Sequence, residues 1–284
     1  MRVKKILFPT DFSDCARHAV DYAIMMARKF QASLDLLYVD EASYLMNPVN
    51  IDLQADVSFV TDEIRKVVED KLRDWVRLFP KEIPVRVAIE MGKPHLEIVE
   101  IAKKHGVDLI LMGTHGRGSS NYFLGSNAER VVRLSPCPVI TVREARKKET
   151  VKKILFPVDF SDLCKRVCPQ VIALAREFGA ELHFLHVSIS FTHETRAFVN
   201  DAFKKFLLDL DLSGITYFTD SYEAFVENTG INEYAHIQDI DLIAIGTHGR
   251  TGIKRLIMGS VTEEVVNTSF IPVLTLRSFN TQIN

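Results

Sequence analysis

Short runs of apolar residues alternate along the chain with longer segments in which apolar residues recur every three or four positions. The short runs are typical of buried strands and the periodic segments of amphipathic helices. In the first half of the chain, strands are expected at Ile6–Pro9, Leu34–Val39, Val85–Ile89, Leu109–Met112 and Val139–Val142. Helices are expected at Asp14–Lys29, Phe59–Phe79 and Leu96–Lys104, with a long loop over Asp40–Ser58.

The second half of the chain repeats this alternation. Its strands are expected at Ile154–Phe156, Leu182–Val187, Ile215–Thr219, Leu242–Ile245 and Val273–Leu276. Its helices are expected at Leu163–Phe178, Glu194–Leu208, Tyr222–Ile237 and Val261–Asn267. Apolar strands that alternate with helices predict a parallel sheet covered on both faces. Right-handed crossovers then predict an α/β fold with a doubly wound, Rossmann-like sheet in each half.

Two motifs occur once in each half of the chain. They are KKILFPTDFSD at Lys4–Asp14, KKILFPVDFSD at Lys152–Asp162, and GTHGR at Gly113–Arg117 and Gly246–Arg250. A repeat this long indicates duplication of a whole domain rather than a solenoid of short units. We therefore expect two tandem domains, 1–145 and 151–279, joined by a charged, exposed linker over Arg143–Lys152.

Composition and charge indicate a globular protein without a strong electrostatic target. The 284 residues are 47% hydrophobic and 25% charged, and the formal net charge is −2. This balance gives no support to binding of nucleic acid or of an acidic membrane. No apolar run reaches the roughly 18 residues of a membrane-spanning helix. We therefore expect no membrane partner and a cytoplasmic location.

The cysteines and histidines show no metal-binding pattern. The four cysteines include no CxxC pair, and Cys164 and Cys168 are expected as buried thiols on one face of a helix. His183 and His186 would point to opposite faces of a strand, so no shared metal is expected. The chain also has no GxxxxGK[ST] motif and no GxGxxG after its first strand, which argues against a P-loop NTPase and against dinucleotide binding.

Two loops in each half follow a strand and carry residue types suited to a nucleotide. The first loop contains Asp11 or Asp159, whose carboxylate can accept hydrogen bonds from a ribose or a base. The second begins with GTHGR, and its glycines let main-chain amides approach a phosphate closely. If the first and fourth strands are neighbours at the switch point of the sheet, the two loops flank one crevice. Taken singly, each loop also fits an ordinary tight turn.

Each glycine-rich loop leads to a serine that is expected to open a helix. Ser126 and Ser260 both begin a capping-box pattern, with Glu129 and Glu263 three residues later. The first turn of a helix has free N–H groups and positive dipole character, which suits a phosphate. Capping boxes also occur in helices that bind nothing.

Together these motifs resemble the universal stress protein family in its tandem, two-domain form. The resemblance rests on Gly246-x2-Gly249-x9-Gly259-Ser260, preceded by the KILFPxDFS segment, and spans nearly the whole chain. It implies binding of ATP or another adenine nucleotide, typically with magnesium. It also implies an internal pseudo-dimer in which the domains pair through their last strands, while a homodimer of chains stays open.

The resemblance assigns nucleotide-binding residues to the second domain. The base and ribose would contact Pro157, Val158, Asp159 and Val187, and the phosphates would contact Gly246, His248, Gly249, Arg250, Gly259, Ser260, Val261 and Thr262. The matching positions of the first domain are expected to form a weaker second site. They are Pro9, Thr10, Asp11, Val39, Gly113, His115, Gly116, Gly125 and Ser126.

The glycine-rich loop of the first domain departs from the family pattern. Nine residues separate Gly249 from Gly259, but only eight separate Gly116 from Gly125. One residue of chain spans about 3.3–3.6 Å, enough to carry amides out of reach of a phosphate. The second loop also carries three basic residues where the first carries one. The better site is therefore expected in the second domain.

We expect a nucleotide-binding protein with a regulatory or stress-response role. Two alternatives stay open: a slow ATP hydrolase or phosphotransferase, and a ligand-free scaffold that binds a partner. His248 and Asp159 are the polar candidates near the phosphates, but the sequence shows no base aligned with an in-line nucleophile. No catalytic residue is assigned.

Overall fold

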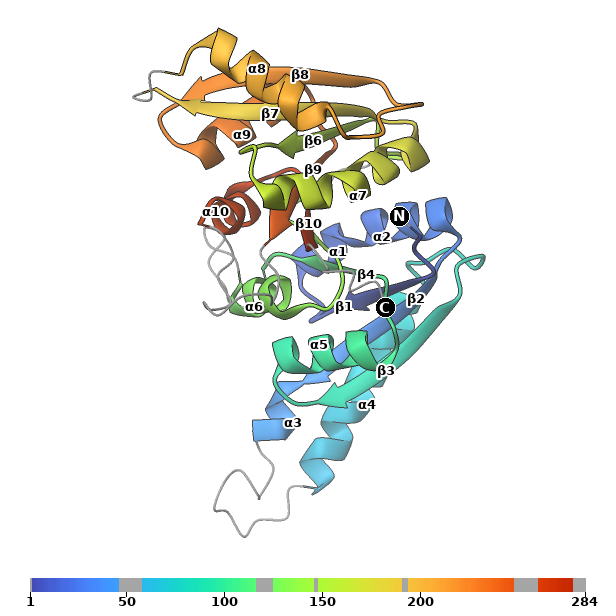
Figure 1. Ribbon diagram of the computed structural model, residues 1–284. Coiled ribbons are helices and arrows are strands. Elements are labelled where there is room, and N and C mark those ends of the chain that lie inside the picture. Colours follow the sequence, from blue (N-terminus) through green and yellow to red (C-terminus); the bar gives the residue numbers. More distant parts are fainter. Residues whose placement is uncertain are drawn as a thin grey trace, which may run out of the picture.

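Within the described residues, ten strands form one continuous sheet with helices on both faces (Figure 1). The computed structural model describes residues 2–45, 58–115, 125–145, 148–190, 194–247 and 260–277. The strand order is β3-β2-β1-β4-β5-β10-β9-β6-β7-β8, so the two halves lie side by side and their last strands meet at the centre. This arrangement confirms the expected α/β fold, with a doubly wound sheet in each half.

The two halves have the same order of strands. The strands of the first half are β1 (Lys5–Pro9), β2 (Ser33–Asp40), β3 (Val85–Met91), β4 (Leu109–Gly113) and β5 (Val139–Val142). Its helices are α1 (Asp14–His18), α2 (Val20–Phe30), α3 (Glu41–Leu45), α4 (Ser58–Val76), α5 (Pro94–Lys104) and α6 (Ser126–Leu134). The strands of the second half are β6 (Lys153–Pro157), β7 (Glu181–Ile189), β8 (Tyr217–Ala224), β9 (Leu242–Thr247) and β10 (Val273–Arg277). Its helices are α7 (Asp162–Phe178), α8 (Arg196–Leu207), α9 (Glu227–Ile237) and α10 (Ser260–Thr268).

The chain order reverses direction at one point in each half. β1 lies in parallel between β2 and β4, and β6 lies in parallel between β7 and β9. The first and fourth strands are therefore neighbours, as the crevice between the two loops requires. Both loops leave the sheet at its carboxyl edge, where open α/β sheets bind ligands.

The two halves are joined by an antiparallel pair of strands. Val139 of β5 lies opposite Thr275 of β10, and Thr141 lies opposite Val273. The two threonine hydroxyls add side-chain bonds across the pair: Thr141 donates to the Val273 carbonyl at 3.4 Å and Thr275 to the Val139 carbonyl at 3.2 Å. The expected pairing of the domains through their last strands is thereby confirmed.

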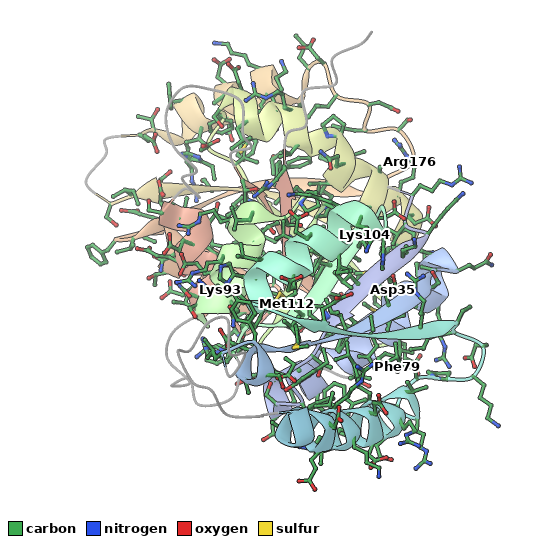
Figure 2. All side chains as sticks on the ribbon, turned by 90° about the horizontal axis from the view of Figure 1, so that it is seen from below. Asp35, Phe79, Lys93, Lys104, Met112 and Arg176 are labelled. Atoms are coloured by element: carbon green, nitrogen blue, oxygen red, sulfur yellow. The ribbon has the colours of Figure 1, made fainter. Side chains whose placement is uncertain are left out.

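Two apolar layers, one on each face of the sheet, hold the helices in place. Ile6 and Phe8 of β1 face the first layer and Leu7 faces the second. The first layer lies under α1, α2, α4, α7 and α8, and it runs across both halves. The second lies under α5, α6, α9 and α10. Figure 2 shows Phe79, a member of the first layer, between α4 and the strands. Since both faces are covered, the central strands are mostly apolar.

The largest difference from the expected element boundaries lies between β8 and α9. The sequence pattern predicts a helix from Tyr222, but β8 continues to Ala224 and α9 begins at Glu227. β8 pairs with β7 over its full length, up to Ala224 opposite Ile189. The main-chain bonds of this pairing outweigh the helical spacing of a few side chains, since local propensity yields to tertiary context.

Two smaller differences lie in the first half. The helix predicted over Asp14–Lys29 is divided at Ala19 into α1 and α2. The loop predicted over Asp40–Ser58 begins with the short helix α3, and its residues 46–57 lie outside the described residues.

The linker between the halves is less exposed than expected. Val151 is buried, and the Lys148 ammonium forms ion pairs with the carboxylates of Asp241 and Asp239, the latter at 3.4 Å. These contacts fasten the linker to the second half. The domain limits 1–145 and 151–279 stay a prediction. Among the described residues, no helix has the length and apolar character needed to cross a membrane.

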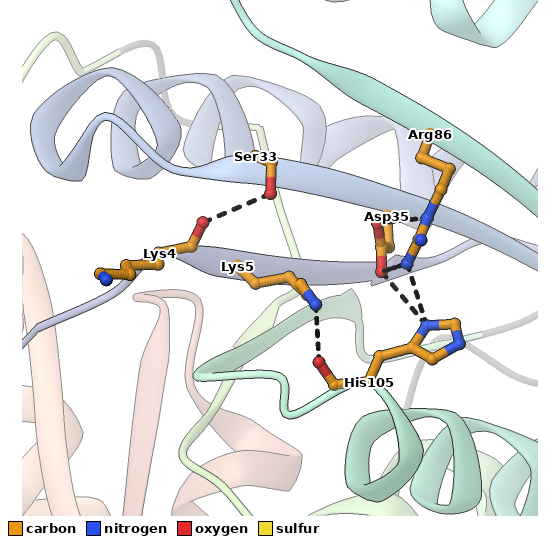
Figure 3. Close-up of polar contacts among 6 residues, drawn as sticks. All are labelled: Lys4, Lys5, Ser33, Asp35, Arg86 and His105. Atoms are coloured by element: carbon orange, nitrogen blue, oxygen red, sulfur yellow. Dashed lines mark hydrogen bonds and ion pairs between the residues drawn. The ribbon is translucent and has the colours of Figure 1, made fainter.

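A charged trio fastens the edge strand β3 to its neighbours (Figure 3). The guanidinium of Arg86 on β3 donates two hydrogen bonds to the carboxylate of Asp35 on β2, at 2.7 and 3.1 Å. The His105 ring, which follows α5, lies 3.1 Å from Arg86 and 3.4 Å from Asp35. The Asp35 carboxylate is the buried member, with a side chain 7% exposed. The hydrogen bonds to Asp35 raise the pKa of Arg86, so the guanidinium stays ionised.

We expect Asp35→Asn to lower the free energy of unfolding by about 1–3 kcal/mol, because Arg86 and His105 lose their buried anion. The measurement is urea unfolding at neutral pH. The control is Glu82→Gln, which removes an ion pair with Arg28 whose two side chains are 60% and 57% exposed. Exposed pairs contribute little, so the control should be close to wild type. Equal losses in the two variants would contradict the role given to the buried carboxylate.

Candidate functional site

A pocket of about 210 Å³ opens at the carboxyl edge of the second half. It contains eight of the residues that the resemblance assigns, which are Pro157, Val158, Asp159, Val187, Gly246, Ser260, Val261 and Thr262. They come from the ends of β6, β7 and β9 and from the first turn of α10. The other four assigned residues, His248, Gly249, Arg250 and Gly259, lie outside the described residues. The fold thus brings together every assigned residue that it describes in this half.

A matching pocket of about 200 Å³ opens in the first half. It contains eight of the nine assigned residues, which are Pro9, Thr10, Asp11, Val39, Gly113, His115, Gly125 and Ser126. Gly116 lies outside the described residues. Met112, labelled in Figure 2, also lines this pocket. The described parts of the two pockets are thus nearly equal in volume.

The loop after the first strand has the same strained turn in both halves. Phe12 and Phe160 have φ angles of +62° and +58°, a left-handed conformation that is rare for a bulky residue. Phe12 stacks on Tyr38 with ring centroids 5.0 Å apart, and Phe160 packs on His186 at 4.8 Å. This aromatic packing compensates for the strain. Strain of this kind tends to occur at functional sites.

The turn is closed by the aspartate and serine of the DFS motif. An oxygen of Asp159 accepts a hydrogen bond from the Ser161 amide at 2.9 Å, and Asp11 accepts one from Ser13 at 3.0 Å. Each serine hydroxyl also caps the following helix. Ser161 accepts a hydrogen bond from the Cys164 amide at 3.3 Å, and Ser13 accepts one from the Ala16 amide at 3.2 Å. These bonds hold each aspartate in the wall of its pocket.

The Asp159 carboxylate is held in its charged form. Burial alone would raise its pKa, but hydrogen bonds from Cys164 and Ser161 outweigh burial and lower the pKa below the usual value. Burial raises the pKa of the neighbouring Cys164 thiol to about 12. A thiol with such a pKa carries no thiolate near neutral pH and is inert. The second pocket therefore presents a fixed anion beside a neutral thiol.

The histidine on β7 is a part of the second pocket that sequence reasoning did not assign. His186 Nδ1 lies 2.9 Å from the Val158 carbonyl and Nε2 lies 3.1 Å from the Glu194 carboxylate. The ring ties the pocket loop to the segment before α8. His183 packs on Phe218 on the other face of the sheet, so the two histidines point apart as expected.

A helix follows each glycine-rich loop as expected, but the cap of α6 differs from the prediction. Ser126 is the first residue of α6, and the N-cap is Gly125, which makes no side-chain capping bond. The predicted capping box at Ser126–Glu129 is therefore wrong. Its cause is the bond from the Gly125 amide to the Thr114 carbonyl at 2.8 Å, which places the turn one residue earlier. Ser260 likewise opens α10, and the residue before it lies outside the described residues.

The first turns of these helices differ between the halves. The hydroxyl of Thr262 in α10 donates to the Gly246 carbonyl at 3.2 Å, which ties the helix to the end of β9. The matching residue of α6 is Ala128, which has no hydroxyl. Glu227 of α9 lines the second pocket, whereas Pro94 takes the corresponding place in the first. The second pocket is thus the more polar of the two at these positions.

The chain matches one protein family along most of its length. The model of the universal stress protein family matches residues 2–143, 150–211 and 227–277. These segments include every described residue of both pockets. The chain belongs to the universal stress protein family.

Individual universal stress proteins match about half of the chain or nearly the whole of it. Universal stress protein MJ0531 of Methanocaldococcus jannaschii is 35% identical over 148 residues, which are 51% of this chain and 85% of that protein. Universal stress protein Slr1230 of Synechocystis sp. is 25% identical over 293 residues, covering 97% of this chain and 100% of its own. The crystal structure of a universal stress protein from Archaeoglobus fulgidus is 20% identical, covers 98% of this chain and 100% of its own, and has a TM-score of 0.76. The last comparison shows that the tandem fold is shared.

Several pocket residues of this universal stress protein were missed by sequence reasoning. In the second pocket they include Leu163, Cys164, Leu185, His186, Glu227, Ile231 and Ile245. The sequence held a partial indication of these residues. Leu185 and Val187 are two apart on a strand, and Glu227 and Ile231 are four apart on a helix. Such spacings place side chains on one face. The spacings do not say which face borders a pocket, because that depends on where the neighbouring helix lies.

The glycine at the end of the fourth strand is under different constraints in the two halves. A Cβ atom on Gly113 would lie 2.8 Å from the main-chain carbon of Cys15, so the backbone of α1 would have to move. A Cβ atom on Gly246 would meet the side chain of Val167 at 3.1 Å, and that side chain can shift.

We expect Gly113→Ala to lower the free energy of unfolding by about 1–3 kcal/mol, as overpacking against a backbone does. Gly246→Ala should cost clearly less. Urea unfolding of both variants measures the difference. The prediction is wrong if Gly246→Ala is the more damaging change.

Proposed function

We propose that this universal stress protein binds ATP or another adenine nucleotide in the second pocket, and more weakly in the first, and that it acts as a regulator in a stress response. The observation that carries the proposal is the convergence, in each half, of all the described residues that the resemblance assigns on one pocket at the switch point of the sheet. The convergence involves three strand ends and one helix start, and tight turns serving the fold alone would not require it.

The apolar wall of the second pocket suits a purine base. Val187, Ile231 and Ile245 line one side of it. Burying a flat apolar ring against such side chains contributes roughly 25 cal/mol for each Å² of apolar surface removed from water. Leu185 and Val261 extend the same wall.

The polar groups of the second pocket suit a ribose and phosphates. The Asp159 carboxylate is ionised and can accept hydrogen bonds from ribose hydroxyls. The first turn of α10 presents main-chain N–H groups and the Ser260 hydroxyl where a phosphate would lie. Residues 248–259, which complete the phosphate site in the family pattern, lie outside the described residues.

Magnesium would accompany the nucleotide mainly through the phosphates. The described residues contain no group of three or more His, Cys, Asp or Glu side chains placed to hold a metal ion. Magnesium commonly takes one or two carboxylates together with substrate phosphates, and keeps several waters. Asp159 and Glu227 are the carboxylates that line the second pocket.

The primary test is thermal unfolding with ATP, ADP and AMP, each with and without magnesium. Cyclic AMP belongs in the panel because one solved universal stress protein is in complex with cAMP. Ligand at a hundredfold above its dissociation constant should stabilise the fold by about 2.7 kcal/mol. A flat response to every nucleotide would contradict the proposal. Mass spectrometry of small molecules released on denaturation separates nucleotide binding from a ligand-free scaffold.

The matched aspartates test which pocket is stronger. We expect Asp159→Asn to weaken nucleotide binding more than Asp11→Asn does, measured by isothermal titration calorimetry. Equal losses would place two comparable sites on the chain and would contradict the asymmetry.

The lowered pKa of Asp159 also predicts how binding depends on pH. A carboxyl whose pKa lies below about 3.9 stays ionised from pH 5 to pH 8. Titration of Asp159 should therefore leave the affinity unchanged over this range, and should weaken it only under acid conditions that protonate the group. Calorimetry at pH 5, 6.5 and 8 checks this. A steep change between pH 5 and 8 would show that another group controls binding.

A further inference from the structure

The antiparallel joint places an arginine of each half against a helix of the other half. Arg143 directly follows β5, and Arg277 is the last residue of β10. In an antiparallel pair, the end of one strand lies beside the beginning of the other. β10 begins just after α10, and β5 begins just after α6. Each arginine therefore lies beside the carboxyl end of the last helix of the opposite half.

The two arginines make equivalent contacts with these helices. Arg277 Nη2 donates to the Val132 carbonyl in the last turn of α6 at 3.2 Å, and also to the Arg133 carbonyl. Arg143 Nη1 donates to the Asn267 carbonyl in the last turn of α10 at 3.0 Å. The last carbonyls of a helix have no partner within the helix, so each arginine supplies donors that the helix itself lacks.

Both helices have their first turn in the wall of a pocket. Ser126 of α6 lines the first pocket and Ser260 of α10 lines the second. A cation at the carboxyl end of a helix stabilises it and opposes the partial negative charge there. Each arginine thus acts, through a helix, on the pocket of the half to which it does not belong.

The main chain of each arginine is held by its own half. Gln170 of α7 donates to the Arg277 carbonyl at 3.2 Å, and the His18 ring of α1 lies 3.2 Å from the Arg143 carbonyl. α1 and α7 each follow the aspartate loop of their own pocket. Each arginine therefore contacts the first helix of its own half and the last helix of the other half.

We infer that Arg143 and Arg277 are positioning residues that act crosswise: Arg143 holds the helix of the second pocket, and Arg277 holds the helix of the first. The helix that forms part of each pocket is thereby held by a residue of the opposite domain. The dependence is greater for the second pocket, because α10 has no basic residue in its last turn while α6 has Arg133. The consequence for ligand affinity rests on the proposed nucleotide binding, whereas the effect on the helices does not.

Amide hydrogen exchange tests the effect on the helices without any ligand. The variants are Arg277→Met and Arg143→Met in the full chain, compared over Ser126–Leu134 and Ser260–Thr268. We expect Arg277→Met to speed exchange in α6 by about two- to fivefold and to leave α10 unchanged. Arg143→Met should do the reverse. The Arg→Lys variants keep the charge and should restore part of the protection.

The control variant is Arg176→Met. Arg176, labelled in Figure 2, also donates to main-chain carbonyls, those of Ser213 at 2.8 Å and Asp211 at 3.2 Å, but it touches neither α6 nor α10. It should change exchange in neither helix. Effects that stay in the arginine's own half, that appear equally in both halves, or that are absent would each overturn the inference.

A titration with ATP and magnesium tests the consequence for binding. The δ1 methyl of Ile98 reports on the first pocket, and those of Ile231 and Ile245 report on the second, so methyl NMR follows both pockets in one sample. Arg143→Met should weaken binding in the second pocket by about two- to fivefold and leave the first unchanged, with the opposite pattern for Arg277→Met. If ATP shifts none of these methyls in the wild type, ATP binding at these pockets is wrong, and the exchange pattern alone decides the inference.

Discussion

The antiparallel pairing of β5 with β10 is the interaction on which the rest of the molecule depends. Each half ends in a short strand that is buried and mostly apolar, and such a strand left unpaired would expose main-chain donors and acceptors beside buried side chains. The pairing removes both edges at once and merges the apolar layer under α2 and α7 into one core. Because the pair is antiparallel, it relates the halves by an approximate twofold axis. The threonine and arginine contacts across the joint therefore occur in matched pairs.

Much of the fold could be predicted because the central strands are apolar on both faces. Short apolar runs such as Ile6–Pro9 and Leu109–Met112, which alternate with helical segments, are typical of buried strands. Because the motifs are duplicated, the elements predicted in one half could be compared with those predicted in the other. The boundary between β8 and α9 could not be predicted, because the apolar residues near Tyr222 fit both the spacing of a strand and that of a helix. Pairing with β7 determines that this segment is a strand. The burial of Val151 also depends on contacts far along the chain.

The candidate site could be predicted in part, and the reason lies in how its residues are placed. Motif residues such as Asp159 and Gly246 sit at strand ends, where the order of the strands alone brings them together. His186 and Glu227 reach the pocket only through the path of their own elements, and the spacing of residues along those elements does not say which face borders a pocket. The positive φ of Phe160 is likewise invisible in the sequence, because phenylalanine rarely adopts it.

Duplication has left two pockets of similar size whose walls have diverged. The structural parts are common to both: the strained turn, the serine cap and the joint that holds each last helix from the other side. The chemical parts differ, with Thr262 and Glu227 in the second pocket where Ala128 and Pro94 stand in the first. Packing at the joint constrains the sequences of both halves, because each half supports the other. The residues of one pocket wall can change without a matching change in the other pocket. A tandem chain can therefore lose or alter one ligand site without losing the fold, because the half that carries it is still needed to complete the sheet.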